Sequence, residues 1–309
     1  MKLAETLKLK HTFISQLRSW FDAQAFIEIQ TPLLVRNPGL EPFLHYFETE
    51  FVPQMGGGNR TKLYLPTSPE YHLKKALALG LDKVFEITKS FRNGEKSKLH
   101  EPEFLMLEWY RHPGTYKDIA GDFFQLCKNL AKSFSTEWEL WNKKTDLSVE
   151  EAFQRFASLN LKELAESSEY EERFHYEMVS KIEPELKNFE GLVYLWDYPS
   201  TFAALSQKKE EDAFYAERFE VYFKGIELAN AFGELTDPTE QRHRCLLDIA
   251  KRQELYGLSP ELDEDFLEAI GKLGLGAGGI AVGLERLFQT MIGKESLQEV
   301  IAFPHWEKL

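Results

Sequence analysis

The chain has 309 residues and is acidic, with 37 lysines and arginines against 50 aspartates and glutamates and a formal charge of −13. Hydrophobic residues make up 43% of it and aromatic residues 14%, so it can bury a large core and wholesale disorder is excluded. A protein that coats nucleic acid by charge alone is also excluded, because neutralising phosphates requires a surplus of lysine and arginine.

The cysteines and the hydropathy of the chain indicate a soluble, cytoplasmic protein. Cys127 and Cys245 match no zinc-binding or CxxC spacing, so we expect two reduced thiols buried by packing. The N-terminus mixes charged and apolar residues at helical spacing and shows no signal-peptide core. The sequence contains no run of about 18 apolar residues, the length that a membrane span requires.

Amphipathic helices and short strands follow one another along the chain. Helical periodicity predicts helices at 3–26, 68–79, 116–134, 240–256, 263–272 and 284–291. Strand periodicity predicts strands at 26–30, 45–52, 62–65, 83–88, 103–111, 192–198, 217–223 and 226–235. We expect a flexible turn at 55–61, a polar helical region at 135–187, and a serine N-cap at Ser68. Because strands outnumber βαβ alternations, the pattern favours an α+β fold with a mostly antiparallel sheet flanked by helices.

A cationic loop joins the strands at 83–88 and 103–111. Arg92 stands where the first of these strands ends, and Lys96, Lys98 and His100 follow it. Such a loop on a rigid hairpin suits a polyphosphate, since arginine can clamp a phosphate or carboxylate through two hydrogen bonds. Taken alone, a solvated basic loop is the commoner explanation.

Three glutamates, Glu220, Glu227 and Glu234, follow one another at intervals of seven residues. Along one strand an odd interval would alternate their faces. A turn at 224–225, however, would place Glu220 and Glu227 on neighbouring strands, and paired carboxylates suit Mg²⁺ bound beside nucleotide phosphates. The alternative, three solvent-facing glutamates, is disfavoured by the apolar residues between them.

A glycine-rich run at 274–283 precedes the last predicted helix. Its small residues would let a ligand approach the backbone closely, and Arg286 would lie in the first turn of the helix. The run lies near the C-terminus, so a dinucleotide-binding fold is not expected.

Taken in this order, the three features resemble the signature motifs of class II aminoacyl-tRNA synthetases over essentially the whole chain. The first helix with Ile27–Pro32 is similar to motif 1, the dimer-forming element, Phe91–Phe104 to motif 2 and Gly283–Arg286 to motif 3. The resemblance is to the lysine type of this class at Thr67–Tyr71, His100–Phe104, Leu107–Tyr110, Ala216–Glu220 and Gly225–Asn230.

The position of motif 1 narrows the resemblance. It starts within thirty residues of Met1, whereas lysyl-tRNA synthetases carry an N-terminal OB-fold domain of roughly a hundred residues or more. We therefore expect one catalytic domain over 1–309 without an OB-fold domain. The chain resembles the branch of the family that ligates (R)-β-lysine to elongation factor P, and Ala281 agrees, because that position is typically glycine in the synthetase. No tRNA partner is expected.

The resemblance implies an ATP-dependent, AMP-forming reaction with Mg²⁺ in a homodimer. ATP would contact Arg92, Asn93, Gly94, Glu95, Glu101, Phe104, Glu227, Leu228, Gly283 and Arg286. The substrate would contact Ser68, Pro69, Glu70, Glu108, Tyr110, Asn230, Glu234 and Ala281. In these roles Arg92 would be catalytic, Glu220 and Glu227 would hold the metal, and Phe104 and Arg286 would enclose adenine.

The resemblance also implies which residues bind the two ammonium groups of the substrate. Glu70 would bind the proximal one, and Glu108, Tyr110 and Glu234 the distal one. Two features depart from the family pattern: Gly94 stands before Glu95, and Glu101 replaces an asparagine.

Two other functions stay open. One is a truncated lysyl-tRNA synthetase-like ligase that activates α-lysine for another acceptor. The other is a non-catalytic regulatory paralogue, which the complete set Arg92, Glu220, Glu227 and Arg286 disfavours, because a binding-only relic has no need of it.

Overall fold

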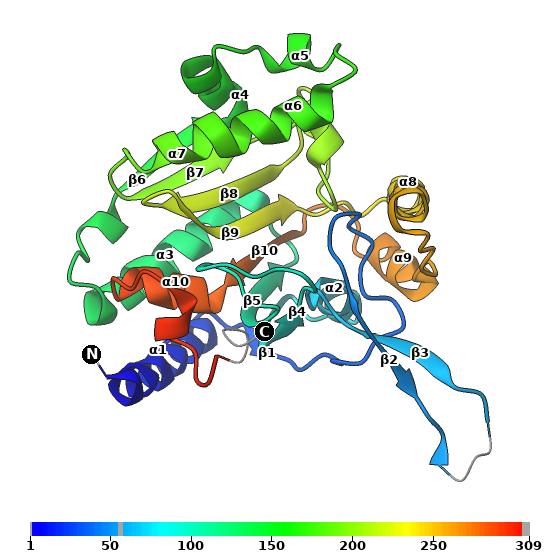
Figure 1. The fold of residues 1–309 in the computed structure, drawn as a ribbon, viewed down its shortest axis with the longest axis horizontal. Helices are drawn as coiled ribbons and strands as arrows, with labels where there is room; N and C mark the ends of the chain where they lie inside the picture. Colours follow the sequence, from blue (N-terminus) through cyan, green and yellow to red (C-terminus); the bar gives the residue numbers. More distant parts are fainter. Residues whose placement is uncertain (1, 55–57, 305–309) are drawn as a thin grey trace.

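A computed structural model describes residues 2–54 and 58–304, and Figure 1 shows their arrangement. The expected flexible turn at 55–61 therefore lies partly outside the described residues. One large sheet forms the centre, in the strand order β1 (Ile27–Glu28), β4 (Lys83–Phe91), β5 (Glu103–Arg111), β10 (Gly278–Gly283), β9 (Ile226–Gly233), β8 (Arg218–Phe223), β7 (Leu192–Trp196) and β6 (Lys144–Ser148).

The sheet is mostly antiparallel, as predicted. The outermost pairs β1–β4 and β6–β7 are parallel, and the pairs between them are antiparallel. A separate hairpin of β2 (Phe47–Phe51) and β3 (Thr61–Leu65) projects from the body in Figure 1. The α+β fold class is confirmed.

Helices flank both faces of the sheet. They are α1 (Leu3–Ala23), α2 (Glu70–Ala78), α3 (Tyr116–Phe134), α4 (Val149–Ala152), α5 (Leu161–Leu164), α6 (Tyr170–Glu177), α7 (Glu183–Leu186), α8 (Pro238–Tyr256), α9 (Glu264–Gly271) and α10 (Leu284–Met291). Shorter 3₁₀ or π turns lie at Leu140–Asn142, Phe153–Ala157, Met178–Ile182, Ser200–Phe202 and Leu297–Glu299.

The main core lies on one face of the sheet. Trp109 of β5, Phe219 of β8 and Ile280 of β10 pack there with Phe123 of α3 and Phe21 of α1, all of them buried. Helix α3 lies behind the sheet in Figure 1. Because side chains alternate along a strand, every second residue of these strands points to the opposite face.

The opposite face is covered only at its two ends. Helices α4, α6 and α7 belong to a second core with Leu195 of β7 and Tyr222 of β8. Helix α2 packs on Val84 and Tyr110 at the other end. The middle of this face, over β5, β10 and β9, is left for a site.

Two strands and one cap differ from the prediction. The region 135–187, predicted to be helical, contains β6, which has a polar sequence and is recognisable only through its parallel pairing with β7. The glycine-rich run contains β10, although glycine is depleted in strands. Pro69, not Ser68, is the N-cap of α2, and the Ser68 hydroxyl accepts from the backbone N–H of Glu70 at 3.3 Å.

Candidate active site

The register of the sheet aligns polar residues on its uncovered face. Glu108 of β5 lies opposite Ala281 of β10, which lies opposite Asn230 of β9, which in turn lies opposite Glu220 of β8. Directly opposite residues of antiparallel strands point to the same face. Residues from four strands, far apart in the sequence, thus form one row across the floor of the site.

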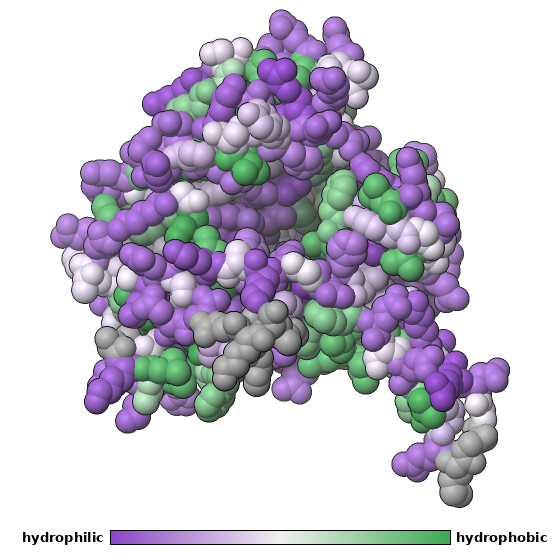
Figure 2. Space-filling view, viewed as in Figure 1, coloured by the Kyte–Doolittle hydropathy of each residue, from purple (hydrophilic) through white to green (hydrophobic). Residues whose placement is uncertain are grey.

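A cavity of about 190 Å³ opens over three members of this row, Glu108, Ala281 and Asn230. In Figure 2 the surface is hollowed near the middle of this face, and hydrophilic side chains border the hollow. The predicted residues that line the cavity are Ser68, Glu70, Arg92, Glu95, Glu101, Phe104, Glu108, Tyr110, Glu227, Leu228, Asn230, Ala281, Gly283 and Arg286.

Five predicted site residues do not line the cavity: Pro69, Asn93, Gly94, Glu220 and Glu234. Asn93 turns away, because its backbone pairs with His45 and its side-chain amide donates to the Tyr46 carbonyl at 3.4 Å. Gly94 has φ +88°, a left-handed conformation that favours glycine, and forms the turn of the loop.

The two departures from the family pattern have structural explanations. The left-handed turn at Gly94 accommodates the extra residue, and Glu95 still reaches the cavity, where its Oε1 lies 3.7 Å from Arg92 Nη1. The Glu101 carboxylate accepts a hydrogen bond from Gln298 at 2.8 Å. One of its oxygens is therefore held by the protein.

A lysine that the sequence analysis missed lies at the acidic end of the site. Lys74 of α2 is 1% exposed, and its Nζ lies 2.6 Å from Glu70 Oε1 and 2.5 Å from Glu234 Oε2. Its spacing of four residues from Glu70 on one helix was the available signal. Lys74 thus joins two of the carboxylates that were predicted to bind the substrate.

Burial perturbs the acids around Lys74. Burial, reinforced by Glu70, raises the pKa of Glu108 well above its usual range, and Tyr110 donates to Glu108 Oε2 at 2.9 Å. Burial also raises the pKa of Glu234 to about 8, although Lys74 opposes the shift. The single positive charge of Lys74 does not neutralise all of these carboxylates. The pocket therefore favours the binding of further cations or the protonation of its acids.

Gly279 of β10 makes room for this pocket. A Cβ atom at Gly279 would lie 2.1 Å from Tyr110 Cε1 and 2.4 Å from Glu234 Oε1. Real Cβ atoms do not approach other atoms so closely, so a side chain here would displace both groups. Gly279 was not among the predicted site residues, although the glycine-rich run that contains it was.

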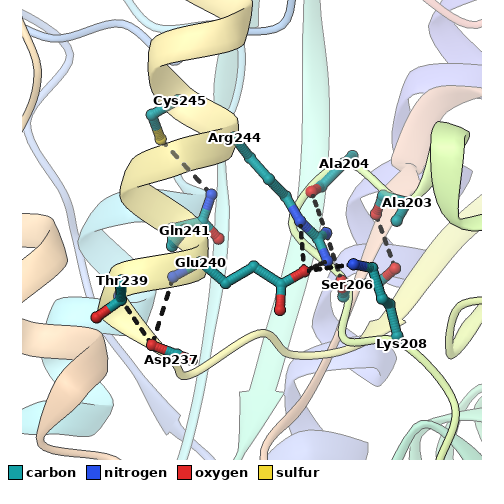
Figure 3. Close-up of polar contacts among 10 residues, drawn as sticks. All are labelled: Ala203, Ala204, Ser206, Lys208, Asp237, Thr239, Glu240, Gln241, Arg244 and Cys245. Atoms are coloured by element: carbon teal, nitrogen blue, oxygen red, sulfur yellow. Dashed lines mark hydrogen bonds and ion pairs between the residues drawn. The ribbon is translucent and has the colours of Figure 1, made fainter. Parts of the chain in front are cut away.

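A network on α8 holds the segment that carries Ala204 and Ser206 (Figure 3). Arg244 Nη1 donates to the carbonyls of Ala204 and Ser206 at 3.0 and 2.7 Å, and Glu240 accepts from Arg244. The backbone of Ser206 in turn bridges to Glu234. Helix α8 therefore positions a pocket acid through the loop that carries Ser206.

Arg92 lines the cavity near these buried acids. Its guanidinium lies 5.4 Å from the centre of the Phe104 ring, and its Nε is buried without a hydrogen-bond partner among the described residues. A buried donor without a partner costs free energy. Arg92 therefore offers hydrogen bonds to a ligand in the cavity.

Arg286 and Phe104 both line the cavity, as predicted for an adenine site. Arg286 Nη1 donates to the Glu227 carbonyl at 2.9 Å, and Nη2 donates to the Leu99 carbonyl at 3.2 Å. Two backbone acceptors from separate segments fix the guanidinium in place, where a flat aromatic group could stack on it.

Glu220 and Glu227 lie on the neighbouring strands β8 and β9, as predicted. Glu220 Oε2 accepts from Tyr198 and Tyr222, each at 2.6 Å, and Oε1 accepts from Arg218 at 2.7 Å. Burial and the charge of Glu220 raise the pKa of Glu227. Three side chains thus orient the Glu220 carboxylate, and among the described residues Oε1 accepts a hydrogen bond from Arg218 alone.

The described residues hold no group of three or more His, Cys, Asp or Glu side chains suited to a metal ion. The two carboxylates Glu220 and Glu227 still fit Mg²⁺, which is commonly bound by one or two carboxylates together with substrate phosphates.

Cys127 and Cys245 are buried free thiols, as expected. Within the described part of the chain, no helix is both long and apolar enough for a membrane span.

The comparisons with known proteins agree with this geometry. The model of the tRNA synthetases class II (D, K and N) family matches residues 1–307. Three similar proteins, from Haemophilus influenzae (strain PittGG), Vibrio atlanticus and Proteus mirabilis, are 36%, 35% and 34% identical to the chain. The alignments cover 94%, 96% and 98% of this chain and 92%, 95% and 95% of the relatives, and each relative is named elongation factor P–(R)-β-lysine ligase.

Proposed function

Because this chain belongs to the class II (D, K and N) tRNA synthetase family, we propose that it is a ligase that joins (R)-β-lysine to a lysine side chain of elongation factor P. The observation that carries the proposal is the polarity of the cavity, in which Arg92 lies beside a buried acidic pocket of Glu70, Glu108 and Glu234. A substrate with two ammonium groups and one carboxylate matches this polarity.

The first step is the activation of the amino acid. A carboxylate oxygen of β-lysine attacks the α-phosphorus of ATP, and the bond from this phosphorus to the bridging oxygen breaks, so that pyrophosphate leaves. Arg92 bridges the carboxylate and the α-phosphate, because two anions approach each other only where a cation compensates their charge. Phe104 and Arg286 enclose the adenine. Glu220 and Glu227 would hold Mg²⁺, which would supply positive charge beside the phosphates.

The second step transfers the amino acid. The ε-amine of the acceptor lysine attacks the carbonyl carbon of the adenylate, the bond to the AMP oxygen breaks, and the amine loses a proton as the amide forms. Glu70 orients the substrate through its proximal ammonium. Glu108, Tyr110, Asn230 and Glu234 surround the distal ammonium, and Ala281 shapes the floor between Glu108 and Asn230.

The remaining features of the proposal concern assembly and location. We propose one catalytic domain, a homodimer formed through α1 and β1, an acceptor that is a protein and not a tRNA, and action in the cytoplasm. Ile27 of β1 is 48% exposed and Leu34 55% exposed, which provides apolar surface for the dimer. Light scattering that shows a monomer would refute this assembly.

The perturbed acids make substrate binding depend on pH. The pKa of Glu234, raised to about 8, means that the empty pocket favours the protonated carboxyl. An ammonium group binds the carboxylate better, so binding releases protons. The KM for (R)-β-lysine is therefore expected to fall as the pH rises from about 6 to 8, whereas the KM for ATP changes little. ATP–pyrophosphate exchange measures both constants.

The Glu234→Gln variant is the control for this pH dependence. It binds the substrate more weakly, and its KM for (R)-β-lysine varies less with pH. A wild-type KM that is constant over this range would contradict the proposed role of the acids.

Intact-mass analysis of elongation factor P tests the function directly. After incubation with this chain, ATP, Mg²⁺ and (R)-β-lysine, elongation factor P is expected to gain the mass of one lysyl residue, and faster than with α-lysine. A faster reaction with α-lysine would favour the alternative ligase. Absence of any adenylate would favour the regulatory paralogue.

A further inference from the structure

A carboxylate with no predicted role lies inside the cavity. Glu41 belongs to the loop between β1 and β2 and lines the cavity together with Ser68, Glu70 and Arg92. A Cβ atom at Gly39 would lie 3.4 Å from Glu41 Oε2, which places this oxygen beside the backbone of its own loop. The motif comparison gave no reason to select Glu41, because it lies outside the three motifs.

The loop holds Glu41 in a defined position. Arg252 of α8 is fully buried, and its Nη1 donates to the Glu41 carbonyl at 2.6 Å and to the Leu44 carbonyl at 2.8 Å. The Tyr46 hydroxyl donates to the Gly39 carbonyl at 2.6 Å. The backbone that carries Glu41 is thus tied to α8 and to β2, so its side chain enters the cavity from a fixed base.

The Glu41 carboxylate is left without a cation by the described residues. Lys74, a fully buried lysine, pairs with Glu70 and Glu234, and within the described ranges no ion pair or hydrogen bond from another side chain engages the Glu41 carboxylate. Burial raises the pKa of Glu41 to about 7; the charge of Glu70 reinforces this shift and that of Arg92 opposes it. The charges of both Glu70 and Arg92 therefore act on the Glu41 carboxylate.

We propose that Glu41 binds the ammonium group nearest to the reacting carboxylate of the substrate, as a second carboxylate beside Glu70. This inference rests on the proposed function. Glu70 shares its charge with Lys74 at 2.6 Å, so it compensates only part of the charge of a second cation. Among the described residues Glu41 forms no such ion pair, since Arg92 is paired with Glu95 and acts on Glu41 from beyond ion-pair distance.

The charge of the occupied pocket agrees with this role. Three ionised carboxylates, Glu41, Glu70 and Glu234, balance three cations, which are Lys74 and the two ammonium groups of the substrate, while Arg92 balances the substrate carboxylate. Glu108 stays protonated in this count, because burial favours its neutral form. Without Glu41, the pocket would hold an excess positive charge, which a buried site does not tolerate.

The test compares two ligands in the full-length protein carrying Glu41→Gln. The KM for (R)-β-lysine in ATP–pyrophosphate exchange is expected to rise about 10- to 100-fold, the loss typical of a hydrogen bond to a charged group, and the KM for ATP to stay the same. The second ligand is 6-aminohexanoic acid, which lacks the proximal amino group. Its inhibition constant is expected to be the same for the variant and the wild type.

The control variant is Glu48→Gln on β2, where the carboxylate is solvent-exposed and pairs with Lys62 at 2.9 Å. It is expected to behave as the wild type with both ligands. A Glu41→Gln variant that loses affinity for both ligands equally, or for neither, would overturn the inference. Thermal melting of Glu41→Gln is expected to match the wild type, because no partner within the described chain is lost.

The experiment distinguishes an error in the role of Glu41 from an error in the proposed function. If the wild type exchanges pyrophosphate with (R)-β-lysine and Glu41→Gln matches it, only the role of Glu41 is wrong. If the wild type shows no exchange with (R)-β-lysine at all, the proposed function and the inference are both wrong.

Discussion

The Arg92→Ala variant is expected to lose amino-acid activation, with kcat/KM for ATP–pyrophosphate exchange reduced about 100- to 1,000-fold. This loss is typical of removing one preorganised donor that stabilises charge in a transition state. Arg92 is the cation that lies between the acidic pocket and the Phe104 side of the cavity, and its Nε has no partner among the described residues. It is therefore available to both reacting anions.

The Arg60→Ala variant is the matched control. Arg60 lies next to β3 on the projecting hairpin, is 69% exposed at its side chain and pairs with Glu50 at 2.9 Å. Its loss is expected to leave exchange unchanged. If Arg92→Ala keeps more than a tenth of the wild-type rate while melting normally, Arg92 does not bridge the two anions.

The Lys74→Met variant is expected to lose about 3–5 kcal/mol of stability, the usual cost of removing one partner of a buried ion pair. Methionine keeps most of the length of the lysine side chain, so the loss reports the charge more than a cavity. Glu70 and Glu234 would then face each other in a buried pocket without the cation that lies 2.6 and 2.5 Å from them. Urea denaturation measures the change.

The loss is expected to grow with pH. Without Lys74, which lowers the pKa of Glu234 in the wild type, this pKa rises further above its value in the unfolded chain. Above about pH 8 the folded wild type has released this proton, whereas the folded variant still holds it. The free energy of unfolding of the variant therefore continues to fall above about pH 8, and the loss relative to the wild type grows there. A loss that is the same at acidic and alkaline pH would contradict this explanation.

Lys75→Met is the matched control on the same helix. Lys75 follows Lys74 directly, but its side chain is 25% exposed and pairs with Asp263 at 2.7 Å near the surface. A partly exposed pair contributes about 1 kcal/mol or less. A Lys74→Met variant no less stable than Lys75→Met would show that the buried cation has no structural role.

The sequence by itself determined the elements with strong local signals and the order of the motifs. The helices at 116–134 and 284–291 were predicted with the bounds that α3 and α10 have, because a long amphipathic period is a local property. The hairpin around Arg92 and the placement of Glu220 and Glu227 on neighbouring strands were also predicted correctly. These features depend on residues close together in the chain.

Only the tertiary structure decided the features that depend on distant neighbours. Strand β10 is recognisable because β5 and β9 pair with both of its edges, and Gly279 is required because Tyr110 and Glu234 fill the space of its side chain. In its local sequence Lys74 resembles any lysine on a helix, and Glu41 resembles any glutamate in a loop. Their partners come from α2, from Glu234 directly after β9, and from α8. Burial and electrostatic coupling between these distant segments give the two residues their place in the site.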